Sequence, residues 1–123
     1  MNCRAIVFNI LLFVAMTTNA VAQKSRGETY KNAANELVRT GNYELAVRQY
    51  DKAIERSPKT ADYYTLRGYA KDMLGNFEAG IADFNKAISL NKKDAVAYGN
   101  RGYAYSMLGK DVLAVYDRQH VFT

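Results

Sequence analysis

Few side chains of this 123-residue chain have the types and spacing that catalysis requires. Asp72 and Asp83 could act as a pair of carboxylates in general acid–base work, but such work also needs a shaped cleft. We expect both to lie on solvated helical faces instead. His120 is the only histidine and Cys3 the only cysteine, so neither has the clustered partners that a metal site or an activated nucleophile needs. The sequence therefore predicts no catalytic residue, no metal ligand and no cofactor.

Side chains suited to binding are more frequent. The chain has ten tyrosines and four methionines, and both residue types provide large contact areas for a protein segment. Tyr69 and Tyr103 lie 34 positions apart, and so do Met73 and Met107. This common spacing indicates that both pairs lie on equivalent structural elements.

The chain repeats itself after 34 positions. Residues 61–75 read ADYYTLRGYAKDMLG and residues 95–109 read AVAYGNRGYAYSMLG, with nine identities. A fixed period of this length indicates stacked helical hairpins. The repeats cover residues 27–60, residues 61–94 and an incomplete third unit, residues 95–123.

Helix boundaries recur with the same period, and we expect six short helices. Three glycines stand where a residue without Cβ can end a helix in the left-handed conformation: Gly41, Gly75 and Gly109. Four polar residues are expected N-caps of the helices that follow: Asn42, Thr60, Asn76 and Asp94.

Small and aromatic residues occupy fixed positions in the first two repeats. They are Ala34, Tyr43, Ala46, Tyr50, Ala53 and Pro58 in the first, and Tyr64, Gly68, Phe77, Gly80, Phe84 and Ala87 in the second. This pattern resembles the tetratricopeptide repeat family. The resemblance implies an all-α fold, a right-handed superhelical stack of antiparallel helix–turn–helix hairpins. It also implies a protein-interaction module and not an enzyme.

In that family the first helix of each repeat lines the concave face of the stack, where a peptide binds. The resemblance places nine residues on this face: Lys31, Asn35, Thr65, Tyr69, Asp72, Met73, Tyr103, Ser106 and Met107. A groove with a polar, basic end and a tyrosine–methionine end would result. Under a second interpretation, Tyr69 and Tyr103 only pack between neighbouring helices.

Lys31 and Asn35 also match two positions with which chaperone-binding members of the family hold a peptide carboxylate. The other clamp positions differ, because Leu66, Val96 and Asn100 stand where further donors belong. A carboxylate would be poorly held without those donors, so chaperone recognition is not expected. A weaker anion contact by Lys31 stays open.

The pattern ends after Ala114 in the third repeat. Arg118 and Val121 replace an aromatic and a small residue, which predicts a short, altered final helix. One interpretation is an incomplete or truncated array. In the other, a partner or a second copy covers the exposed face, which would give a homo-oligomer.

The first 22 residues have the features of a secretory signal. Arg4 precedes an apolar stretch over residues 5–16, and the segment ends in Ala20, Val21 and Ala22. The apolar stretch is shorter than the roughly 20 residues of a comfortable membrane span. We expect cleavage after Ala22, a repeat domain over residues 23–123, and an exported chain, periplasmic or secreted, with no membrane contact. A retained N-terminal anchor is the alternative.

Charge does not point to a nucleic-acid partner. The net charge is +5 at pH 7, but basic and acidic residues are mixed along the chain and form no basic stripe. The predicted function is that of an adaptor or scaffold that binds a protein or peptide segment in the cell envelope. The alternatives are a fragment or accessory domain of a longer envelope protein or enzyme, and a self-associating structural protein.

Overall fold

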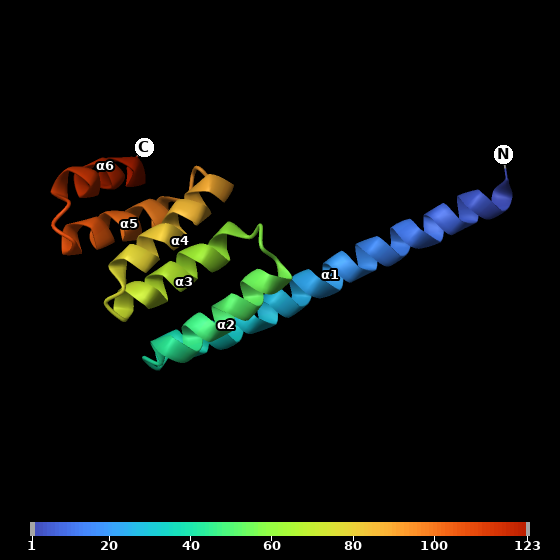
Figure 1. Ribbon diagram of the computed structural model, residues 1–123, viewed down its shortest axis with the longest axis horizontal. Coiled ribbons are helices and arrows are strands. Elements are labelled where there is room, and N and C mark those ends of the chain that lie inside the picture. Colours follow the sequence, from blue (N-terminus) through green and yellow to red (C-terminus); the bar gives the residue numbers. More distant parts are fainter. Residues whose placement is uncertain (1, 123) are drawn as a thin grey trace.

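The computed structural model describes residues 2–122, and this part of the chain forms six helices and no strand. They are α1 (Cys3–Arg39), α2 (Tyr43–Arg56), α3 (Ala61–Met73), α4 (Phe77–Leu90), α5 (Ala95–Met107) and α6 (Asp111–Val121). Consecutive helices pair as the hairpins α1/α2, α3/α4 and α5/α6, and each hairpin packs against the next (Figure 1). The predicted all-α stack of helical hairpins is confirmed.

Glycine ends the first helix of each hairpin, as predicted. Gly41, Gly75 and Gly109 have φ angles of 80°, 81° and 70°. Next to Gly41, the N–H of Asn42 donates to the Leu37 carbonyl at 2.8 Å, which satisfies an acceptor at the end of α1. The same bond recurs after each of the other two glycines. These turns fold the chain back on itself.

The four predicted N-cap positions are confirmed, but only one of these residues caps its helix through its side chain. Asp94 accepts a hydrogen bond from the Ala97 N–H at 3.0 Å. Asn42, Thr60 and Asn76 occupy the N-cap positions without a side-chain capping bond. For all three, the backbone N–H bonds back to the preceding segment, and this bond holds the turn without a side-chain cap.

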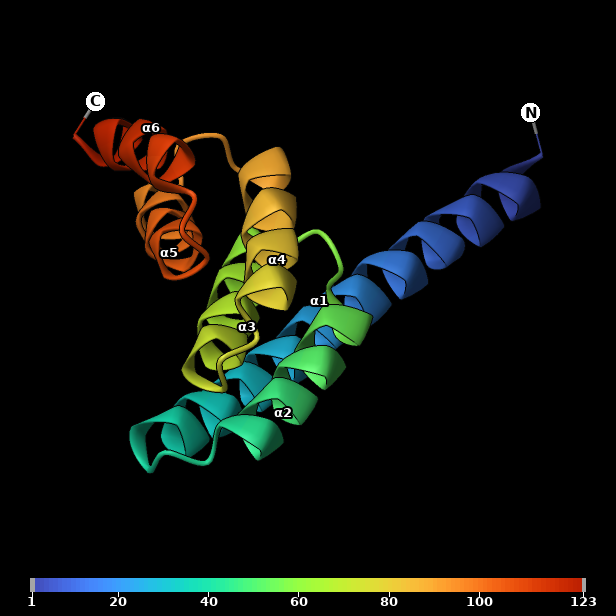
Figure 2. The same ribbon diagram turned by 60° about the vertical axis from the view of Figure 1, so that its left-hand side comes forward.

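The first helix is much longer than expected. With 37 residues, α1 continues from the N-terminal segment into the first repeat, so the expectation of six short helices is correct in number but wrong for the length of α1. No proline interrupts it, and the internal Gly27 is buried against Tyr63 and Ala53. Its N-terminal half extends away from the stack (Figures 1 and 2). By length and composition α1 could cross a membrane, although a signal sequence has the same properties.

Small residues allow the helices to pack closely. Ala34, Ala46 and Ala53 are fully buried in the first hairpin, as the pattern predicts. A Cβ at Gly68 would lie 2.6 Å from Cε1 of Phe84, so a larger residue at this position would force the Phe84 ring to move. The recurring small residues therefore set the distance between the helices.

Arg67 connects three helices through hydrogen bonds. Its Nε and Nη2 donate to both carboxylate oxygens of Asp83 on α4, at 2.9 and 2.7 Å. Its Nη1 donates to Asp51 on α2, at 2.7 Å. Since Asp83 is only 4% exposed, the bidentate pair also compensates a buried charge. Arg67 thus links its own hairpin to the preceding one.

Arg101 repeats this arrangement 34 positions later and fixes the final helix. It donates to both oxygens of Asp117 on α6, at 2.7 and 2.6 Å, and to Asn85 on α4 at 2.8 Å. Asp117 is 1% exposed. The expectation that the pattern ends after Ala114 is therefore wrong at Asp117, whose carboxylate holds α6 in place. The helix is short, as predicted, with 11 residues.

Candidate functional site

Residues of two neighbouring helices line a hollow of about 370 Å³, here called the α3/α5 groove. Tyr69, Asp72 and Met73 come from α3, and Asn100 and Tyr103 come from α5. Each helix is the first of its hairpin, and the two contact each other directly. The structure therefore brings together four of the nine residues that the resemblance placed on the concave face.

Helical spacing explains why the groove has an aromatic and thioether surface. Tyr69 and Met73 lie four residues apart and therefore share one face of α3. They are 38% and 46% exposed, while Ala70 on another face of the helix is fully buried. Tyr103 is 56% exposed and packs edge-on against Phe77, with 6.2 Å between ring centroids. Both tyrosines are thus partly packed and partly open to the groove.

Asp72 gives the groove a buried carboxyl group. It is 6% exposed, and its Oδ1 atom has no hydrogen-bond partner. Burial raises the pKa of this carboxyl group to about 7, because the charged form loses its hydration. The expectation that Asp72 and Asp83 are solvated surface charges is therefore wrong. The two buried carboxylates differ in their partners. Asp83 forms ion pairs with Arg67 and, at 2.9 Å, with Lys71, whereas Asp72 forms none.

The predicted basic end of the site is occupied by internal contacts. Lys31 Nζ forms an ion pair with Glu28 Oε2 at 2.6 Å, and Asn35 Oδ1 accepts a hydrogen bond from the Tyr50 hydroxyl at 2.6 Å. Hydrogen bonds from Lys31 and Tyr63 lower the pKa of Glu28. Neither Lys31 nor Asn35 lines the α3/α5 groove. Their side chains instead stabilise the first hairpin and its contact with α3.

Thr65 contributes to packing and not to an open surface. It is 3% exposed, and its hydroxyl donates to Asp94 Oδ2 at 2.8 Å. The same carboxylate caps α5, so Thr65 connects α3 to the start of α5. Its predicted place on the concave face is wrong, because the neighbouring hairpin covers this position.

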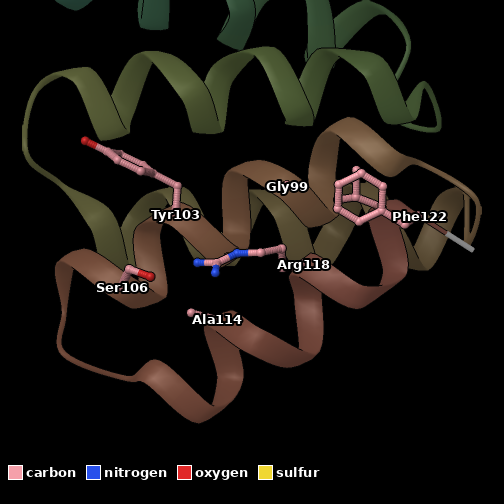
Figure 3. A pocket seen from close by; sticks show the side chains of 8 residues that line it. Gly99, Tyr103, Ser106, Ala114, Arg118 and Phe122 are labelled. Atoms are coloured by element: carbon pink, nitrogen blue, oxygen red, sulfur yellow. The ribbon is translucent and has the colours of Figure 1, made fainter.

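A second hollow, of about 320 Å³, lies between α5 and α6. Its lining consists of Gly99, Gly102, Tyr103, Ser106, Ala114, Arg118, Val121 and Phe122. Figure 3 shows Arg118 extending across this hollow. Tyr103 belongs to both hollows, so the two adjoin. Met107 is 53% exposed and lines neither of them.

The chemistry of these surfaces suits contact with a protein segment. Within residues 2–122, no three His, Cys, Asp or Glu side chains gather where they could hold a metal ion. His120 stacks on the Tyr98 ring, with 4.8 Å between centroids. The α3/α5 groove offers aromatic rings, a thioether, an amide and a carboxyl group, which are typical of peptide recognition.

Sequence reasoning missed some residues that position the site. Asn100 was considered only as part of a carboxylate clamp, yet it lines the groove. The arginine–aspartate pairs were missed as well, although Arg67 and Arg101 lie 34 positions apart, as do Asp83 and Asp117. The period itself was the signal that could have identified them.

Comparisons with known proteins agree with this geometry. A family model described as tetratricopeptide repeat matches residues 31–95, and a second with the same description matches residues 84–116. The chain belongs to the tetratricopeptide repeat family. A curated tetratricopeptide relative, the TPR repeat-containing thioredoxin TTL4 of Arabidopsis thaliana, is 40% identical over 57 residues. That match covers 46% of this chain and 8% of the relative, so the chain spans a small part of that protein.

Solved tetratricopeptide domains have the same architecture. The first TPR of Spaghetti (RPAP3), bound to the HSP90 peptide SRMEEVD, is 28% identical with a TM-score of 0.79, over 80% of both chains. The Arabidopsis OM64 TPR domain is 29% identical with a TM-score of 0.80, over 81% of this chain and 83% of that one. The TPR2B domain of yeast Sti1, in complex with pHsp70, is 26% identical with a TM-score of 0.77, over 79% and 78%.

Proposed function

We propose that this chain is an adaptor that binds a protein or peptide segment in the α3/α5 groove. The observation that carries the proposal is the groove itself, in which Tyr69, Met73 and Tyr103 present exposed apolar surface beside the polar Asp72 and Asn100. Such a combination provides contact area together with groups that fix orientation. Similar tetratricopeptide domains in complex with peptides support this function.

The ligand we propose differs from the peptide held by the RPAP3 domain. That peptide, SRMEEVD, carries three acidic residues. Here Lys31 is paired with Glu28, Asn35 accepts from Tyr50, and the groove contains a carboxyl group. Lys31 and Asn35 are thus engaged outside the groove, and no basic residue lines the groove itself, so an acidic peptide is poorly matched.

A peptide-array experiment with matched variants tests the groove. We expect Tyr103→Ala to weaken the binding of selected peptides about tenfold or more, as for an aromatic residue at the centre of an interface. Tyr116→Ala is the control, because Tyr116 is 54% exposed and lines neither hollow. Equal binding by both variants would show that the ligand lies elsewhere.

We also propose that the chain acts in the cell envelope after export and cleavage behind Ala22. The support is that every side chain from Cys3 to Ala22 is exposed and that Gln23 is the first partly shielded residue. Cleavage there would remove no packed side chain from the repeats. Cell fractionation and N-terminal sequencing test this, with Gln23 expected as the first residue. A retained residue 1 in the membrane fraction would favour an anchor.

Self-association is a second candidate function. Val112 and Phe122 on and beside α6 are 85% and 84% exposed, so this end of the stack presents apolar surface. If a homo-oligomer forms through the third repeat, deletion of residues 121–123 should dissociate it, and the molar mass measured by light scattering should fall. An unchanged mass would exclude this interface. The chain's small share of the TTL4 relative also leaves a role as part of a longer protein, which the coding sequence would decide.

A further inference from the structure

Asp72 stands out among the buried acidic residues. Asp83 and Asp117 are each held by both arms of an arginine. Asp72 is also more than nine-tenths buried, but its Oδ1 atom has no hydrogen-bond partner, and the groove that it lines contains no basic side chain. Lys71, the next residue along the helix, is engaged with Asp83. A buried carboxyl group without a partner is unfavourable and calls for a specific explanation.

The second repeat is shaped to accommodate this carboxyl group. Gly80 on α4 faces Asp72, and a Cβ there would overlap Asp72 Oδ1. The corresponding residues of the other repeats are Ala46 and Ala114, and both are buried. Only the second repeat combines an aspartate on its first helix with a glycine opposite, so the room for the carboxyl group is a feature of this site.

The other groove residues suit a long cationic side chain. Tyr69 and Tyr103 provide aromatic rings, which can attract a cation, and Met73 can contact an alkyl stem. Asn100 adds an amide that can accept a hydrogen bond from an ammonium or guanidinium group. Around Asp72, the groove thus combines apolar contacts for the stem of a lysine or arginine side chain with polar groups for its cationic head.

We propose that the α3/α5 groove receives a lysine or arginine side chain of a bound protein segment, whose cationic head pairs with Asp72. This inference rests on the proposed peptide-binding function and names the class of its ligand. The stem of the side chain lies between Tyr69, Met73 and Tyr103, and its head meets Asp72 where that residue lines the groove, while the unpartnered Oδ1 atom itself faces Gly80 on α4. The partner is therefore a basic segment of a protein.

Short peptides of random sequence on an array provide the probe, with the full chain in a mild detergent. Each binding peptide is then made again with citrulline for arginine and acetyl-lysine for lysine, which removes the charge and keeps the length. We expect binders to be rich in basic residues and the neutral versions to bind about tenfold more weakly, as for a hydrogen bond to a charged group. Asp72→Asn should cause the same loss, and neutral peptides should bind both forms equally.

Two further variants separate the outcomes. Glu78→Gln removes an exposed acidic charge on α4 outside the groove and should leave binding unchanged. Asp72→Ser, which introduces the residue found at the equivalent Ser106, repeats the test if Asp72→Asn lowers the melting temperature. Equal binding of charged and neutral peptides, or no effect of either Asp72 variant, would overturn the inference. The proposed function would stand in that case if Tyr103→Ala still weakened binding. Absence of any binding peptide would overturn the proposed function as well.

Discussion

The unpaired carboxyl group of Asp72 should make the stability of the fold depend on pH. Burial raises the pKa of Asp72 from its ordinary value of 3.8 to about 7. Well below the ordinary pKa of 3.8, both the folded and the unfolded chain hold the proton, and burial carries no ionic penalty. As the pH rises toward 7, the unfolded chain ionises first, so the free energy of unfolding falls. Above pH 7 both states are ionised and the penalty stays constant.

The magnitude follows from the difference between the two pKa values. The pKa of Asp72 is raised by about three pKa units, and each unit corresponds to about 1.4 kcal/mol. The free energy of unfolding should therefore fall by about 4 kcal/mol between pH 4 and pH 8. Asp72→Asn removes the ionisable group and keeps its shape. The variant should therefore gain stability relative to the unchanged chain as the pH rises, and the gain should level off above pH 7.

Urea unfolding followed by circular dichroism, at intervals between pH 4 and pH 8, measures this difference. Other groups titrate in the same range, but they are common to both proteins and cancel in the comparison. A constant difference between the two proteins over the whole range would refute the reasoning, because it would mean that Asp72 ionises as readily in the folded chain as in the unfolded one.

Two more predictions concern the contacts that hold the hairpins together. Arg101→Met should lower the free energy of unfolding by about 3 kcal/mol in urea unfolding, because it leaves Asp117, which is 1% exposed, without its bidentate partner. Gly68→Ala should lower it by about 2 kcal/mol in the same assay, since the added Cβ would lie 2.6 Å from the Phe84 ring. Gly99→Ala, whose Cβ would be 3.6 Å from Val121, should be neutral or stabilising.

Controls for these predictions lie on the same elements. Arg118→Met changes an exposed arginine on α6 and should alter stability by less than about 0.5 kcal/mol. A loss as large as that of Arg101→Met would contradict the role assigned to the Asp117 pair. Equal effects of the two glycine variants would contradict close packing at Gly68.

The hairpins could be predicted because their signals are local. Gly41 can adopt a left-handed conformation that other residues rarely adopt, so its place in the sequence marks the turn. Small residues recur at the positions of Ala34 and Ala53, as Gly68 and Ala87, because a larger side chain would separate the helices. Each signal depends on one residue and its near neighbours, and the 34-residue period repeats it along the chain.

The groove was predicted only in part, because its members depend on which contacts form between hairpins. Lys31 and Thr65 were assigned to it from their positions in the repeat, yet Lys31 pairs with Glu28 and Thr65 bonds to Asp94. Asn100 reaches the groove from the next repeat. A repeat position specifies the helix and its face, but not the neighbour that covers that face.

The helical hairpins and their turns follow from the 34-residue period and from residue type, whereas the place of Tyr69 and Tyr103 on the concave face was implied by the family resemblance. The state of the charges depends on the tertiary structure. Asp83 and Asp117 are buried and paired because an arginine from another helix reaches them, whereas Asp72 is buried and unpaired because Gly80 leaves room for it and no basic side chain lines its groove. Ionisation depends on hydration and on partners brought from distant parts of the chain, and these exist only once the hairpins have stacked.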